Sequence, residues 1–158
     1  MLKRLGTVGA VTGVAVLAVG SVGPATGQTS VTGNGDDHQV VRVLSTNTEE
    51  AFVDVGEPDF SLGDSFVFSS TLTRHGETVG HTGVVCTITS VQMEESQCVG
   101  TAWLRRGQIS VQGLLAGEPE EFELPITGGT GAFEGAGGTL VVRVISDTKE
   151  RLTFHITD

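Results

Sequence analysis

The sequence predicts an all-β domain built from eight short antiparallel strands. Apolar and polar residues alternate over short segments, which is the two-residue period of strands with one buried face. Brief turn sequences containing Gly, Pro or Asp separate these segments. Beyond about residue 27, no segment carries a sustained helical period. Strands of this kind form either a closed barrel or a two-layer sandwich, and the pattern alone hardly separates the two.

The first 27 residues are excluded from this domain because they are organised like a secretory signal peptide. Lys3 and Arg4 form a short basic start, residues 5–22 are apolar, and Ala25-Thr26-Gly27 offers small residues for cleavage. The apolar stretch is also long enough for a permanent membrane helix, but its many glycines and the Pro24 exit favour a cleavable signal helix. Residues 28–39 are read as a flexible lead-in, and residues 40–158 as the domain. The mature protein is expected to be secreted.

The strands follow one another with short connections, apart from an acidic stretch after the first. Residues 40–48 alternate, so that Val41, Val43, Ser45 and Asn47 share one face while Arg42 marks the other. Residues 49–59 are read as a long connection. The last predicted strand places Leu152, Phe154 and Ile156 on one face. The seven strands after the first are expected at residues 64–74, 79–91, 97–104, 108–115, 122–127, 139–145 and 151–156.

The charge balance excludes two classes of partner. The chain carries 9 Lys and Arg against 19 Asp and Glu, a formal net charge of -10. Without a cluster of basic residues it lacks the electrostatic surface that nucleic-acid binding requires. An acidic protein is also repelled by anionic lipid surfaces. We therefore expect no nucleic acid and no membrane as partners.

Two cysteines, Cys86 and Cys98, lie on consecutive predicted strands. An even number of cysteines in an exported chain favours one disulfide, and a bridge across this hairpin is geometrically feasible. The alternative is a pair of small buried thiols, because the sequence does not fix the register of the two strands. No Cys-x-x-Cys or His-x-x-x-His spacing occurs, so no metal site is expected.

Several short sequences, in the same order along the chain, resemble the allene oxide cyclase and dirigent barrel superfamily, particularly its bacterial cyclase-like members. The likeness runs from about Val40 to Thr157. It implies an eight-stranded antiparallel closed β-barrel, calycin-like in shape. The sequences that carry it are Ser61-Leu62-Gly63-Asp64, Val79-Gly80 with Thr82-Gly83, Cys86, Ser110-Val111-Gln112-Gly113, and the glycine turn 128–138 around Phe133.

The resemblance also suggests site residues. Plant allene oxide cyclases hold a fatty-acid epoxide in the barrel lumen, assisted by a glutamate and an asparagine on the first strand and a cysteine in the wall. Here the asparagine corresponds to Asn47, the cysteine to Cys86, and Ser45 replaces the glutamate. A hydroxyl cannot supply the charge of a carboxylate at neutral pH, so jasmonate-type cyclisation is not predicted. The residues expected to line the lumen are Val43, Ser45, Asn47, Phe66, Phe68 and Trp103.

Two functions remain open at this point. One is an isomerase or cyclase that folds a small apolar substrate in the lumen, where confinement contributes more than acids and bases. The other is a secreted barrel that only binds a ligand or has a structural role, because one scaffold hosts unrelated activities. Trp103 could serve as a platform for the ligand or as a core plug. No cofactor is expected, and the trimeric plant members allow a homo-oligomer. A lumen of about 300 Å³ or more would favour ligand handling.

Overall fold

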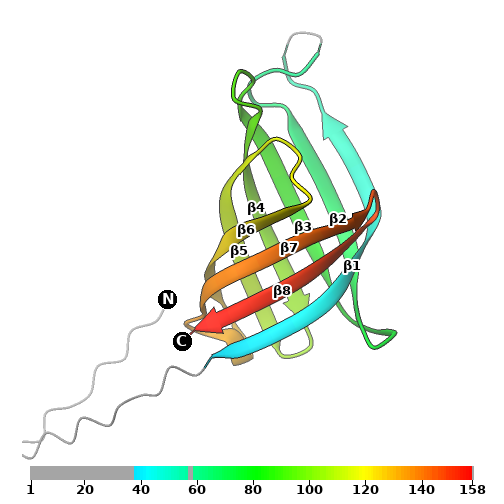
Figure 1. The fold of residues 1–158 in the computed structure, drawn as a ribbon, viewed down its shortest axis with the longest axis vertical. Coiled ribbons are helices and arrows are strands. Elements are labelled where there is room, and N and C mark those ends of the chain that lie inside the picture. The colour runs from blue at the N-terminus through cyan, green and yellow to red at the C-terminus, as the bar shows by residue number, and fades with distance from the viewer. Residues whose placement is uncertain (1–37, 57–58, 158) are drawn as a thin grey trace, which may run out of the picture. The chain divides into compact units, whose positions relative to one another are not determined.

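The computed structural model describes residues 38–56 and 59–157, which form a closed antiparallel barrel (Figure 1). Each strand pairs with its neighbours in the sequence, and β1 pairs with β8 to close the sheet. The predicted all-β fold and its barrel closure are confirmed. The strands are β1 (Gln39–Val53), β2 (Ser65–Arg74), β3 (Glu77–Ser90), β4 (Glu95–Leu104), β5 (Gly107–Ala116), β6 (Glu121–Gly129), β7 (Gly137–Ser146) and β8 (Lys149–Thr157).

β1 is longer than the sequence indicates. Residues 49–53 were expected in a connection but continue the strand, where they pair with residues 65–69 of β2. The register shifts between Asn47 and Glu49, which marks a β-bulge. One extra residue at a bulge reverses the alternation of faces beyond it. Odd-numbered side chains therefore point inward before the bulge, whereas the even-numbered Glu50 lines the interior after it.

One half of the interior is packed with apolar side chains. They come from all parts of the chain and are almost fully buried, so this end of the barrel holds the hydrophobic core. Both ends of the barrel sequence lie at this end of the molecule, where β1 begins and β8 finishes (Figure 1). The packed residues include Val41, Val43, Leu72, Leu104, Ile109, Ile126, Phe133 and Ile156.

The β6–β7 connection closes this packed end. It contains a short 3-10 helix, η1 (Gly131–Phe133), which buries Phe133 to 3 % exposure. Thr130 N–H donates to the Gln108 carbonyl over 2.9 Å, and Ala132 N–H donates to the Arg106 carbonyl over 2.8 Å. Gly131 has a φ of +64°, a region that L side chains rarely adopt, and a Cβ there would also collide with the Arg106 carbonyl. The glycine turn therefore exists to hold Phe133 against β5.

At the opposite end, a buried aspartate shapes the β1–β2 connection. Asp64 accepts hydrogen bonds from Val55 N–H over 2.9 Å and from Ser61 N–H over 2.7 Å. These two backbone donors, with a smaller contribution from the Ser61 hydroxyl, hold the pKa of Asp64 below its ordinary value. The carboxylate thus fixes the connection that carries Phe60, and its role is structural.

The expected signal peptide at residues 1–27 and most of the lead-in at residues 28–39 lie outside the described residues. Gln39, the last residue of that lead-in, begins β1. Within the described part of the chain, no helix is long and apolar enough to cross a membrane.

Candidate functional site

The other half of the barrel encloses a cavity of about 990 Å³ that opens at the end formed by the β1–β2, β3–β4, β5–β6 and β7–β8 connections. Its volume exceeds the 300 Å³ expected of a ligand-handling barrel and lies within the usual range for small-molecule sites. The wall is mostly apolar. Its larger apolar side chains are Phe60, Phe66, Phe68, Ile88, Leu115, Phe122, Leu124, Leu140, Leu152 and Phe154.

The structure places four of the six predicted lumen residues on the cavity wall. Ser45, Asn47, Phe66 and Phe68 all line it. Val43 points inward as expected but belongs to the packed half, so it does not reach the cavity. A ligand-binding role for the four lining residues stays a prediction.

The prediction for Trp103 is wrong. Its side chain is 56 % exposed on the outside of the barrel, stacked on His81 with ring centroids 5.5 Å apart. Its neighbours Ala102 and Leu104 take the inward positions, with exposures of 4 % and 7 %. Because successive side chains of a strand point to opposite faces, two buried neighbours force Trp103 outward. Trp103 is therefore neither a plug nor a platform inside the lumen.

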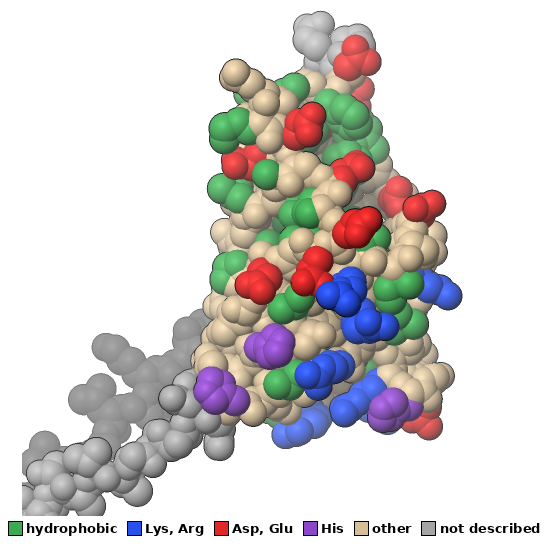
Figure 2. All heavy atoms as spheres, in the orientation of Figure 1, with side chains coloured by type: hydrophobic (Ala, Val, Ile, Leu, Met, Phe, Trp, Pro, Cys, Tyr) green, Lys and Arg blue, Asp and Glu red, His purple; other side chains and the backbone are tan. Residues whose placement is uncertain are grey.

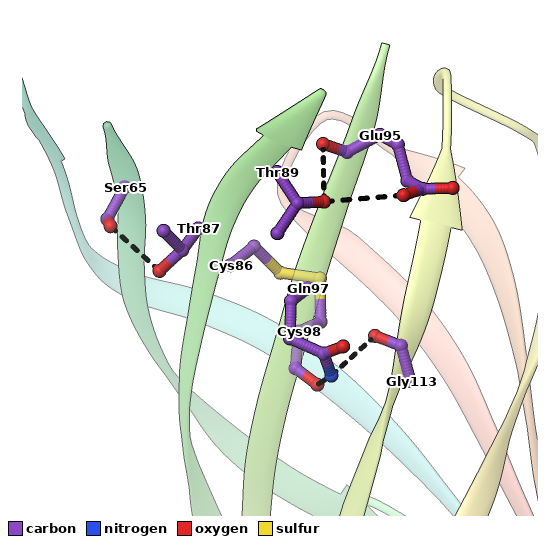
Figure 3. Close-up of a disulfide and its surroundings, with 8 residues drawn as sticks. All are labelled: Ser65, Cys86, Thr87, Thr89, Glu95, Gln97, Cys98 and Gly113. Carbon is purple, nitrogen blue, oxygen red and sulfur yellow. Dashed lines mark hydrogen bonds between the residues drawn. A yellow bond between two sulfur atoms is a disulfide. The ribbon is translucent and has the colours of Figure 1, made fainter. Parts of the chain in front are cut away.

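Cys86 and Cys98 form a disulfide in the cavity wall (Figure 3). The two residues lie directly opposite each other on β3 and β4, with Cα atoms 4.0 Å apart. The predicted bridge is confirmed. Its consequence corrects one candidate, because Cys86 has no free thiol in this state and cannot act as a catalytic acid or nucleophile.

Asn47 lies at the bulge of β1, where its side chain meets that of Glu50. The Asn47 Nδ2 donates to Glu50 Oε2 over 2.8 Å. The Asn47 Oδ1 is buried and has no hydrogen-bond partner among the described residues. A buried carbonyl oxygen without a donor is costly, so this atom favours a ligand that brings an N–H or O–H group. Glu50 was not predicted from the sequence, because the alternation of apolar and polar residues in β1 does not reveal the bulge that turns Glu50 inward.

A second carboxylate lies in the wall on β8. Glu150 pairs in register with Ser45, so a glutamate stands beside the hydroxyl that replaces the family's glutamate. Burial raises the pKa of the Glu150 carboxyl above its ordinary value, because desolvation disfavours the charged form. This residue could have been found from the sequence. It is in phase with Leu152, Phe154 and Ile156, and only the assumed strand start at residue 151 excluded it.

Across residues 38–56 and 59–157, no group of three or more His, Cys, Asp or Glu side chains is arranged to hold an ion. The cavity itself offers apolar walls, a buried hydrogen-bond acceptor at Asn47 and a partly buried carboxyl group at Glu150.

Sequence comparison agrees with this barrel. The family model "Allene oxide cyclase barrel like domain" matches residues 39–157, which is the whole of the described barrel. The chain belongs to this family. No curated protein sequence gives a significant match. The resemblance inferred from the glycine turn and the short sequences before it is confirmed.

Solved structures resemble this allene oxide cyclase barrel-like domain as well. A pyocyanin demethylase is 28 % identical, with a TM-score of 0.69, over 75 % of this chain and 100 % of that chain. A pterocarpan synthase dirigent protein is 17 % identical, with a TM-score of 0.61, over 87 % and 97 %. A Diels Alderase from Streptomyces koyangensis is 11 % identical, with a TM-score of 0.59, over 77 % and 69 %. The last two likenesses show the shared fold alone.

Proposed function

We propose that this barrel binds one small, largely apolar molecule in its cavity. The observation that carries the proposal is the cavity itself, about 990 Å³ in volume, mostly apolar, and open at one end. Natural ligand sites combine an apolar wall with a few well-placed polar groups. Here the polar groups include Ser45, Asn47, Glu50 and Glu150, which lie together on β1 and the adjoining β8. The similarity to a pyocyanin demethylase supports a small molecule as the ligand.

The wall suits a molecule with rings. Phe66 and Phe68 on β2, Phe122 on β6 and Phe154 on β8 reach the cavity from three parts of the barrel. At its mouth, Phe52 contacts Phe60 and Phe66 with ring centroids 5.4 and 5.0 Å apart. Aromatic side chains bury flat apolar surface and add a geometric preference for stacked or edge-on rings. The unpartnered Asn47 Oδ1 would then accept one hydrogen bond from the bound molecule.

Glu150 gives the site a proton donor or acceptor next to the ligand. A carboxyl group whose pKa is raised by burial is better matched to proton transfer near neutral pH. Together with confinement of a flexible substrate, this supports an isomerase or cyclase that steers ring closure. A non-catalytic carrier would use the same cavity without that proton transfer.

We further propose that the protein works outside the reducing cytoplasm. The basic and apolar start of the sequence supports export. The disulfide supports it independently, because such bonds persist in oxidising compartments.

Binding is tested with a neutral fluorescent probe, anthracenemethanol, and two matched variants. Val84 on β3 lines the cavity and pairs in register with Phe68 on the neighbouring strand β2, whereas the adjacent Val85 faces solvent. Val84→Trp narrows the cavity and should weaken binding by at least about fivefold, while Val85→Trp should leave it unchanged. Equal binding by both variants and the parent would contradict a site in the cavity.

For turnover, a ligand recovered by native mass spectrometry from the source host should be converted by the parent protein and left unchanged by Glu150→Gln.

A further inference from the structure

The ionisable residues that line the cavity are almost all acidic. Among the residues that the structure describes, they comprise seven carboxylates and one cation, Lys149. The carboxylates come from β1, the β3–β4 turn, the β5–β6 connection and the β7–β8 hairpin, so they surround the mouth rather than gather on one side. They are Glu50, Glu94, Glu95, Glu118, Glu120, Asp147 and Glu150.

The acidic residues at the mouth do not simply reflect the overall negative charge of the chain, because the arginines lie elsewhere on the barrel. Arg74, Arg105 and Arg106 lie at the two turns of the opposite, packed end. Arg42, Arg143 and Arg151 line a groove on the outer face of the barrel. Figure 2 shows the resulting separation, with Asp and Glu mostly over the upper part of this face and Lys, Arg and His mostly over the lower part.

Within the described residues, the seven carboxylates that line the cavity form no salt bridge. In the described residues the one salt bridge joins Arg143 to Glu121, on the outer surface away from the cavity. Glu50 accepts a hydrogen bond from Asn47, and Glu95 accepts one from the Thr89 hydroxyl, but both donors are neutral. Like charges gathered around a low-dielectric opening focus a negative potential into it.

We propose that the molecule bound in the cavity is an aromatic cation, with its rings against the phenylalanines and its positive charge at the mouth. This inference rests on the proposed function and specifies the chemical class of the ligand. A cation is drawn into the opening by the ring of carboxylates, whereas an anion of the same shape is repelled by it. Phe60 and Phe66 also line the cavity, and aromatic rings there would attract a cation placed over them.

The inner polar groups fit the same class of ligand. An ammonium or protonated ring nitrogen carries N–H donors, and Asn47 Oδ1 is a buried acceptor without one. Glu50 stands next to it as a hydrogen-bonded carboxylate. Glu150 is partly buried and forms no salt bridge among the described residues, so a positively charged ligand would favour its ionised form.

The test uses three anthracene probes of one shape and different charge. Anthracenylmethylammonium, anthracenemethanol and anthracenecarboxylate are titrated into the protein at low ionic strength and followed by fluorescence. The parent protein should bind the ammonium probe at least about tenfold more tightly than the carboxylate probe, and the preference should shrink as the salt concentration rises. The neutral probe should lie between them and respond little to salt.

Two double variants separate the mouth from the overall charge of the protein. Glu50→Gln with Glu150→Gln removes two carboxylates from the cavity. Glu123→Gln with Glu134→Gln removes two exposed carboxylates that do not line it. The first pair should weaken binding of the ammonium probe about fivefold more than binding of the neutral probe, while the second pair should weaken neither.

Each outcome decides between the two proposals. Equal or tighter binding of the carboxylate probe would overturn the cationic ligand while leaving the cavity site intact. An equal loss of ammonium binding in both double variants would also overturn it, since the attraction would then come from net charge alone. Failure of all three probes to bind would overturn the proposed function together with this inference.

Discussion

Loss of the Cys86–Cys98 bridge should have a large and calculable effect on stability. We consider the double variant Cys86→Ala with Cys98→Ala. The two cysteines are separated by 12 residues, so the bond closes a short loop in the unfolded chain. The chain-entropy relation for a loop of that length gives about 3 kcal/mol of stabilisation at 25 °C. For a domain of this size that corresponds to a fall in Tm of roughly 10–15 °C.

The assay is urea and thermal unfolding of the parent and the variant, each with and without a reducing agent. The parent should lose stability on reduction until it matches the variant, and the variant itself should not respond to the reductant. A variant within about 0.5 kcal/mol of the oxidised parent would refute the reasoning, because unfolded-state entropy would then not be what the bond restricts.

Two further predictions concern single residues. Glu150→Gln should raise Tm at neutral pH, because it removes a carboxyl whose charged form is disfavoured by burial. The wild-type carboxyl contributes its full stability below its ordinary pKa of 4.5 and loses it as the pH rises through the raised value, so the two proteins should converge in acid. A variant that is less stable at neutral pH would contradict this. Gly138→Ala should cost about 2 kcal/mol, since Gly138 has a φ of +106° and a Cβ there collides with the His155 carbonyl. Gly83→Ala, where nothing lies within 4 Å of the added Cβ, is the control and should be near neutral.

Much of the barrel could be predicted because its strands obey a simple alternation. Val41, Val43 and Ser45 are inside, as are Leu152, Phe154 and Ile156, and each set follows from a two-residue period. The prediction of a closed barrel rather than a sandwich came from the family resemblance, because alternation of apolar and polar residues indicates only which face of a strand is buried. The disulfide became certain only when the register placed Cys86 opposite Cys98.

The misses have specific causes. A bulge is a property of two paired strands, so the shift at Asn47 could not be predicted from β1 alone, and Glu50 was missed with it. Trp103 was predicted to lie inside because large aromatic residues usually fill cores, although its neighbours Ala102 and Leu104 already take the inward positions. The hollow half was also beyond the sequence, since the same phenylalanines could either fill a tube or line it.

The closure of the packed end by Phe133 and the β6–β7 connection has a kinetic consequence. In the part of the chain that the structure describes, Phe133 and the hydrophobic core fill one end of the barrel and the cavity opens at the other, so a bound molecule would enter and leave through the same opening. A competing ligand cannot enter behind the bound molecule, so the dissociation rate of the bound molecule should not depend on the concentration of the competitor. If the barrel converts a substrate, the product must leave through the same opening before the next substrate enters, so product release is expected to limit the rate.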